Sequence, residues 1–232
     1  MRRILMAGAF ALAAGGQAFA ADLPMPAPPV PPPAYIPVLP VYNWTGFYIG
    51  INSGGAFGNS NWTDPSPAFP PTGNFTVNGF LIGGTIGGNY QISSFVLGVE
   101  GDGDWSNING TTFNTSCVAV GCQTKSNWLA TVRGRAGWAW DRVLFYGTGG
   151  AAFANVQAAA GAFPFMSATQ TGWTAGAGVE YAFAPNWTAK VEYLFVDLAN
   201  ASCGTVNCGG TTTTVSLNEN VIRGGINFKF GW

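Results

Sequence analysis

From residue 44 onward, hydrophobic and polar positions alternate with a period of two in eight segments of the chain. In the first such segment, Phe47, Ile49 and Ile51 stand at odd positions, while Tyr48 and Asn52 stand at even ones. This alternation is typical of β-strands with two different faces and differs from the 3.6-residue period of an amphipathic helix. We therefore predict eight strands, at residues 47–57, 80–91, 95–105, 128–140, 143–153, 173–183, 187–195 and 222–232.

The connections between these segments alternate in length. Short connections lie at residues 92–94, 141–142 and 185–186, and long ones span about 59–75, 107–126, 156–170 and 200–218. Short turns on one side and long loops on the other are typical of outer-membrane barrels. We predict an all-β fold, an eight-stranded antiparallel up-and-down transmembrane β-barrel. Its even strand number places both termini on the periplasmic side with the short turns, and the long loops on the extracellular side.

The two faces of the predicted strands differ in chemistry. One face is apolar or glycine, with aromatic side chains near both strand ends, as at Phe47 and Phe57 or at Trp128 and Trp140. Two aromatic girdles around an apolar band indicate a barrel that faces lipid, whereas a soluble ligand-binding barrel has the opposite polarity. The other face carries ten charged residues, Glu100, Asp102, Asp104, Arg133, Arg135, Glu180, Lys190, Glu192, Arg223 and Lys229. Because an Arg or Lys at the lipid midplane costs roughly 2–4 kcal/mol, we predict that these residues form ion pairs in the lumen.

The start of the chain has the features of a secretory signal peptide. A basic region (MRR) precedes an apolar stretch at residues 4–14, and the small residues AFA at 18–20 form a cleavage site. We predict that residues 1–20 are the signal peptide.

A proline-rich segment follows the predicted leader. Residues 23–40 contain nine prolines, which favour an extended polyproline conformation. We predict a periplasmic linker at residues 21–42, acting as a spacer or as a tether to a periplasmic partner. The barrel then occupies residues 43–232.

Composition and charge narrow the function. Only 8% of the residues are charged, against about 25% in ordinary soluble proteins, and the formal net charge is −1. This balance argues against nucleic-acid binding, which usually needs a basic patch. Histidine, the commonest general base and metal ligand, is absent. We therefore expect no catalytic residues, no metal site and no cofactor.

The four cysteines form two pairs with the spacing C-x4-C, Cys117 with Cys122 and Cys203 with Cys208. In an oxidising compartment we predict one disulfide within each of two long loops. A cross-loop pairing and a zinc site with four thiolates remain alternatives, because the sequence does not determine connectivity.

Three segments resemble a known family. They are NWTGFYIG at residues 43–50, VEYLFVDL at residues 191–198 and the closing segment 221–232. They are similar to the small outer-membrane immunogenic proteins of alphaproteobacteria, the opacity-type porin family of OmpA-like eight-stranded barrels. The resemblance implies structural and surface-antigen roles. It also implies that Phe228, Phe230 and Trp232 form the C-terminal signal read by the barrel-assembly machinery.

Three functions compete at this point. The first is a structural barrel and surface antigen with little or no conductance, since an eight-stranded lumen is just wide enough for side chains to fill. The alternatives are a narrow porin for small solutes and, with less support, a membrane-embedded lipid-modifying enzyme. If the charged residues plug the lumen, replacing Arg133 and Arg135 by alanine should destabilise the barrel and open a leak. We expect outer-membrane lipid, lipopolysaccharide and the assembly machinery as partners, while a ligand or host partner of the loops stays open.

Overall fold

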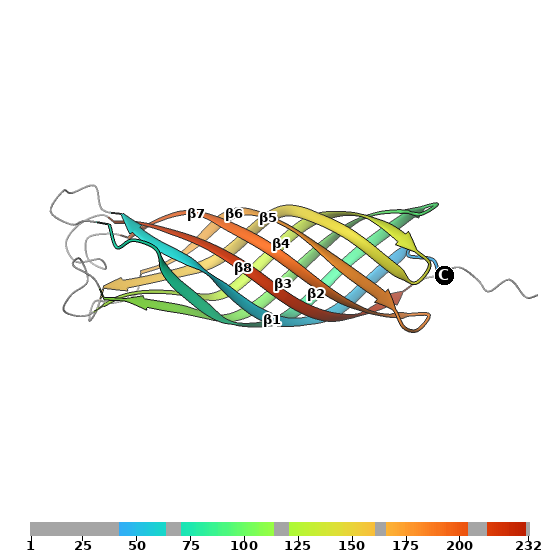
Figure 1. The fold of residues 1–232 in the computed structure, drawn as a ribbon, viewed down its shortest axis with the longest axis horizontal. Coiled ribbons are helices and arrows are strands. Elements are labelled where there is room, and N and C mark those ends of the chain that lie inside the picture. The colour runs from blue at the N-terminus through green and yellow to red at the C-terminus, as the bar shows by residue number, and fades with distance from the viewer. Residues whose placement is uncertain (1–41, 64–70, 114–120, 161–165, 204–212, 231–232) are drawn as a thin grey trace, which may run out of the picture. The chain divides into compact units, whose positions relative to one another are not determined.

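A computed structural model describes residues 42–63, 71–113, 121–160, 166–203 and 213–230. The described residues form eight strands (Figure 1). Their bounds are β1 Gly46–Thr63, β2 Phe75–Ile92, β3 Phe95–Thr112, β4 Cys122–Trp140, β5 Val143–Ala160, β6 Met166–Ala182, β7 Trp187–Cys203 and β8 Thr213–Phe230. Within the described ranges, no helix is long and apolar enough to cross a membrane. The predicted signal peptide and all of the predicted linker except Tyr42 lie outside these residues.

The sheet closes on itself. Each strand pairs antiparallel with the next, and β8 pairs with β1, where Phe47 faces Phe230 at one end and Thr63 faces Thr214 at the other. The short turns after β2 and β4 contain Ser93 and Asp141, whose φ angles of 56° and 49° are typical of tight hairpins. β1 begins and β8 ends at this same end of the barrel, here called the turn end (Figure 1). The predicted fold class is confirmed.

The strands extend further toward the opposite end, here called the loop end, than the alternation predicted. β1 continues to Thr63 rather than ending at Phe57, and β8 begins at Thr213 rather than at Ile222. The predicted long loops are therefore too long, and the connections shorten to 64–74, 113–121, 161–165 and 204–212. The reason is an inversion of polarity. The loop-end aromatic girdle is the ring of outward-facing aromatic side chains that includes Phe57, Trp105 and Trp128. Beyond it the alternation persists, but polar side chains such as Asn59 face outward and apolar ones such as Trp62 face inward.

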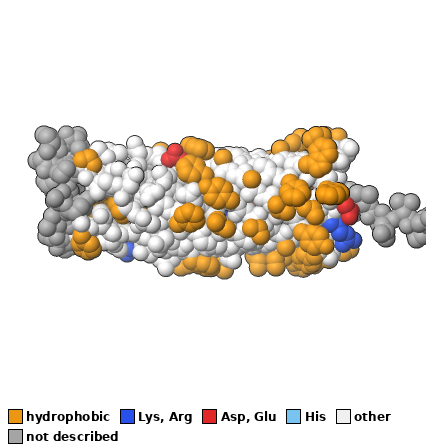
Figure 2. All heavy atoms as spheres, viewed as in Figure 1, with side chains coloured by type: hydrophobic (Ala, Val, Ile, Leu, Met, Phe, Trp, Pro, Cys, Tyr) orange, Lys and Arg blue, Asp and Glu red, His pale blue; other side chains and the backbone are white. Residues whose placement is uncertain are grey.

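The outer surface consequently has two bands. The turn-end part of the wall is an apolar band, and Figure 2 shows hydrophobic side chains gathered there, with a mostly non-hydrophobic zone between them and the loop end. We call this second zone the polar collar. It comprises the outward-facing positions of residues 59–63, 76–78, 107–111, 123–127, 155–157, 167–171, 197–202 and 214–220. Apart from Ala199, these positions hold Asn, Gln, Ser or Thr and two charged residues, Lys125 and Asp197.

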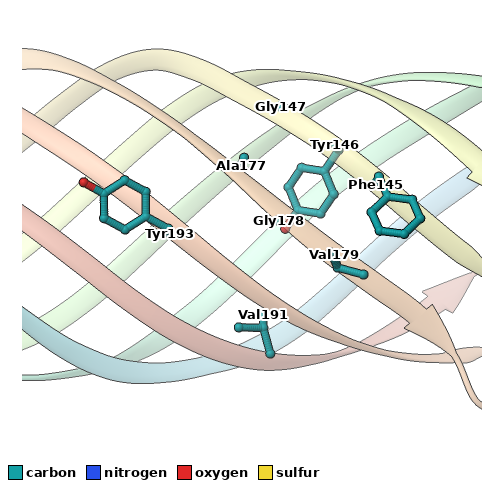
Figure 3. A pocket seen from close by; sticks show the side chains of 8 residues that line it. All are labelled: Phe145, Tyr146, Gly147, Ala177, Gly178, Val179, Val191 and Tyr193. Carbon is teal, nitrogen blue, oxygen red and sulfur yellow. The ribbon is translucent and has the colours of Figure 1, made fainter.

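The apolar band carries a shallow hollow of about 580 Å³ across β5, β6 and β7 (Figure 3). The small residues Gly147 and Ala177 lie within it, and Phe145 and Tyr193 border it. Gly147 and Ala177 face outward, so the hollow belongs to the lipid-facing wall and not to the lumen.

The inward-facing side chains form three layers. Along β4 they run from Leu129 through the charged Arg133 and Arg135 to Ala139. The turn-end apolar cluster consists of Tyr42, Trp44, Val96, Ala139, Leu144, Tyr146 and Ala182. The loop-end apolar cluster consists of Ala56, Trp62, Phe75, Val77, Leu81, Ile108, Cys122, Leu129, Ala152, Ala154, Val156, Ala158, Leu194, Val196, Leu198, Ala201, Val215, Leu217 and Val221. Charged residues lie between the two clusters.

Candidate functional site: the charged layer of the lumen

Nine charged residues from five strands meet inside the barrel. We call them the ion-pair layer. They are Glu100, Asp102 and Asp104 of β3, Arg133 and Arg135 of β4, Glu180 of β6, Lys190 and Glu192 of β7, and Arg223 of β8. Each is almost fully buried. Such burial is tolerated only because every charge has partners of opposite sign.

Arg133 connects three carboxylates. Its Nη2 lies 2.6 Å from Glu100 Oε1 and 2.6 Å from Asp102 Oδ2, and its Nη1 lies 2.9 Å from Glu192 Oε2. Glu100 is the register neighbour of Arg133, whereas Glu192 reaches it from β7. One guanidinium therefore ties β4 both to the adjacent strand and across the lumen.

Arg223 makes a second junction on the opposite wall. Its Nη2 lies 2.8 Å from Glu192 Oε1 and 3.0 Å from Asp102 Oδ2, while Nη1 lies 2.9 Å from Asp104 Oδ2. Asp102 and Glu192 thus contact both Arg133 and Arg223. The planar guanidinium with its five N–H donors suits such shared, multidentate contacts.

Arg135 and Lys190 complete the layer toward the turn end. Arg135 Nη2 lies 2.7 Å from Glu180 Oε2, and Lys190 Nζ lies 2.8 Å from Glu100 Oε2. The Arg135 guanidinium also stacks over the ring of Tyr146, with its central carbon 4.0 Å from the ring centroid.

Two tyrosines line the layer because neighbouring strands carry glycine. Tyr48 donates a hydrogen bond of 2.8 Å to Glu100 Oε2, and Tyr146 donates one of 3.2 Å to Glu192 Oε2. A methyl group at Gly87 would collide with the Tyr48 hydroxyl, and one at Gly178 with the Tyr146 hydroxyl. Glycine at these inward positions therefore makes room for side chains that cross the lumen.

Hydroxyl and amide groups satisfy further carboxylate oxygens. Thr85 and Thr131 donate to Asp102 at 2.8 and 2.9 Å. Thr188 and Asn227 both donate to Glu180 Oε1, at 2.5 and 3.0 Å. Carboxylates held in this way act as fixed acceptors. Among the described residues, no group of three or more His, Cys, Asp or Glu could hold a metal ion.

The sequence analysis predicted that Lys229 forms ion pairs in the lumen, and this prediction is wrong. Its Nζ donates instead to the carbonyl of Asn43 and lies 4.5 Å from the ring centroid of Tyr42. The reason is its place at the end of β8, where the residues that precede β1 fold over the mouth of the barrel. Burial raises the pKa of Tyr42 to about 12.

These preceding residues close the turn end, which the alternation did not predict. Trp44 is 1% exposed; its backbone N–H donates to Gln91 Oε1 at 2.7 Å and its indole N–H to the Asp141 carbonyl at 3.1 Å. The backbone N–H of Tyr42 donates to Asp141 Oδ1 at 3.1 Å. Trp44 and Tyr42 therefore belong to the closing layer of the barrel. No periodic signal marks them, because they precede the first strand.

Glu219 is a buried charged residue that the sequence analysis missed. It is fully buried on β8 between Leu217 and Val221, two members of the loop-end apolar cluster. Neither of its carboxylate oxygens has a hydrogen-bond partner among the described residues. Extending the period-two pattern below residue 222 would have placed Glu219 on the inner face.

The predicted cysteines are only partly described by the structure. Cys122 begins β4 and is buried. The side chains of Cys117, Cys203 and Cys208 are outside the described residues, so both predicted pairings stay predictions.

The predicted assembly signal lies at the turn end of β8. Phe228 and Phe230 occupy outward positions, with ring centroids 5.0 Å apart and an interplanar angle of 80°. Trp232 lies outside the described residues.

The chain is similar to known outer-membrane proteins. Residues 8–230 match the family described as outer membrane protein beta-barrel domain. The 31 kDa outer-membrane immunogenic protein of Brucella melitensis biotype 1 is 36% identical, over 99% of this chain and 100% of that protein. The 25 kDa outer-membrane immunogenic protein of Brucella canis is 29% identical, over 99% of each chain. Among solved structures, neisserial surface protein A has a TM-score of 0.46 at 16% identity and covers 80% of this chain and 98% of its own.

Proposed function

The chain belongs to the outer membrane protein β-barrel family, and on this premise we propose a function. The protein is a structural barrel that acts as a surface antigen and conducts little or no solute. The expected family resemblance is confirmed, and the protein is an outer-membrane β-barrel. The antigenic role is supported by its relatives, which are named immunogenic outer-membrane proteins.

The main support for low conductance is that side chains fill the lumen in three layers. The ion-pair layer spans the lumen, because Arg223 of β8 bonds to Asp104 of β3 and Arg133 of β4 bonds to Glu192 of β7. Apolar clusters lie on both sides of it. A solute would have to break buried ion pairs and also cross two apolar layers, and apolar constrictions exclude water and ions.

The proposed orientation places the turn end in the periplasm and the loop end outside the cell. It is supported by the short turns at one end, since outer-membrane barrels keep short turns periplasmic. The signal peptide at residues 1–20 and the linker at residues 21–42 would then deliver the chain and precede the barrel in the periplasm. Protease added to intact cells should cut the loops and spare the turn end.

We further propose that the barrel is not an enzyme and needs no cofactor. The sequence contains no histidine. The acids of the ion-pair layer are engaged by arginine or lysine, so they are poorly suited to exchange protons with a substrate.

Single-channel recording in planar bilayers tests the proposal. Refolded wild-type protein should give no resolved channel events at a protein density where a general porin, used as a positive control, inserts frequently. Regular, reproducible steps would contradict the closed barrel and favour the narrow porin.

A further inference from the structure

We propose that the polar collar binds uncharged sugars of lipopolysaccharide in the surrounding outer leaflet, with Trp105, Asn107, Asn127 and Trp128 as its main site. The proposal rests on the proposed function in one respect, the orientation of the loop end toward the cell exterior. It does not depend on whether the lumen conducts.

A local irregularity of the sheet creates this site. The register shifts on both sides of β4, beyond Trp105 in the pairing with β3 and beyond Ser126 in the pairing with β5. Successive residues of a strand normally point to opposite faces, but here Asn127 and Trp128 are both exposed. The hydroxyl of Ser106 donates to the Ser126 carbonyl at 2.8 Å and holds the bulge in place.

Two indoles and two amides meet at the border between the apolar band and the polar collar. Trp105 and Trp128 are register partners, and they are 58% and 36% exposed. Asn107 follows Trp105 by two residues and is also exposed. An indole offers a flat apolar face with a polar edge, which suits the C–H face of a sugar ring. Asn offers both donors and acceptors for the hydroxyls around that ring.

The small number of charged side chains in the polar collar indicates what kind of ligand it binds. Within the described outward positions it has one cation, Lys125, and one anion, Asp197. Recognition of phosphate groups usually depends on Arg or Lys, which form short charge-assisted hydrogen bonds. Amide and hydroxyl side chains instead match neutral hydroxyl groups. The polar collar therefore fits the sugars of lipopolysaccharide rather than its phosphates.

The position of the polar collar matches the location of these sugars. It begins directly beyond the loop-end aromatic girdle, whose side chains mark the border of the hydrocarbon region. Sugars attached to outer-leaflet lipid lie at this height around the barrel.

Hydrogen bonds hold some side chains of the polar collar in place. Asn61 Nδ2 donates to Asn74 Oδ1 at 3.0 Å, between β1 and the residue before β2. Asn155 Nδ2 donates to Ser167 Oγ at 3.0 Å, between β5 and β6. Side chains ordered before binding lose less entropy when a ligand arrives.

The test compares two lipids that differ only in their sugars. The protein is refolded into phosphatidylcholine bilayers that contain either lipopolysaccharide with its core oligosaccharide or the lipid A part alone. Thermal unfolding is followed by the gel shift between folded and unfolded barrel. We expect the midpoint in the sugar-bearing bilayer to exceed that in the lipid A bilayer by about 3 °C or more, because a ligand that binds only the folded state raises its stability.

Matched variants locate the site. The double variant Asn107→Ala/Asn127→Ala should lose most of this difference. The double variant Asn59→Ala/Asn218→Ala should keep it, since these register partners lie in the polar collar between β1 and β8, away from the two indoles. Both variants should unfold like the wild type in phosphatidylcholine alone.

A measurement on the wild-type protein tests the same site without relying on a variant that folds. Oxidative footprinting should show Trp105 and Trp128 protected by the sugar-bearing lipid and not by lipid A. Equal midpoints in the two bilayers with unprotected tryptophans would overturn the proposal. An effect that disappears on chelation of divalent cations would also overturn it, because it would point to phosphate bridging. Neither result would change the conductance recording, so failure here is distinct from failure of the closed barrel.

Discussion

At the scale of single residues, Arg133 is one of two arginines that each contact three carboxylates of the ion-pair layer. Replacing Arg133 by alanine leaves Glu100, Asp102 and Glu192 without this partner in a buried layer. Breaking a buried pair in this way costs roughly 3–5 kcal/mol. We therefore expect Arg133→Ala to lower the free energy of unfolding in urea by about that amount. Arg142→Ala, at an exposed turn position, is the control and should change it by no more than about 0.5 kcal/mol.

Two buried glutamates should respond in opposite ways to the same substitution. Glu192 accepts hydrogen bonds from Arg133 and Arg223, so Glu192→Gln removes a charge that two cations require. Glu219 has no partner among the described residues, so Glu219→Gln removes a charge that nothing balances. We expect Glu192→Gln to destabilise the barrel by about 3 kcal/mol and Glu219→Gln to leave it unchanged or more stable. Equal losses in urea unfolding would show that Glu219 has a partner in the folded protein.

At the scale of strands, the sequence predicted which way each side chain faces better than it predicted where each strand ends. The period of two placed Phe47 outward and Arg133 inward, because burial forces a strand with two unlike environments to alternate. It missed the loop-end part of each strand because the outside there is water. Asn59 outward and Trp62 inward reverse the polarity that marks a lipid-facing strand. Lys229 was misplaced because its partner, Asn43, lies before the first strand and carries no periodic signal.

The loop-end extensions are testable by hydrogen exchange. Residues 108–111 of β3 and 123–126 of β4 fall within a predicted loop, yet their backbones belong to the β3–β4 ladder. Amides in a paired ladder exchange only when the strands separate, whereas loop amides exchange freely. We expect slow exchange in both segments after dilution into D₂O at neutral pH, comparable to that of residues 131–135. Complete exchange within seconds would show that these strands end at the loop-end aromatic girdle.

At the scale of the whole molecule, the proposed closed state depends on three layers of different chemistry in the lumen. A single ionic plug would open when its arginines are removed, as the sequence alone suggested. The structure adds the loop-end apolar cluster, which includes Leu129 and Leu194, and the turn-end cluster around Trp44. Thinning the ion-pair layer therefore leaves two apolar constrictions across the same path.

This layering predicts the order in which conductance appears. Arg133→Ala/Arg135→Ala should be less stable than the wild type but nearly silent in planar bilayers, because the apolar layers still exclude water and ions. Adding Leu129→Ser and Leu194→Ser to the two arginine substitutions should hydrate the loop-end apolar cluster. Adding Trp44→Ala as well should open the turn-end apolar cluster. Channel events should become frequent only when all three layers are altered. The Leu129→Ser/Leu194→Ser pair alone is the matched control and should stay silent. If the two arginine substitutions by themselves produce stable channel events, the apolar clusters do not seal the barrel and the ion pairs are its only plug.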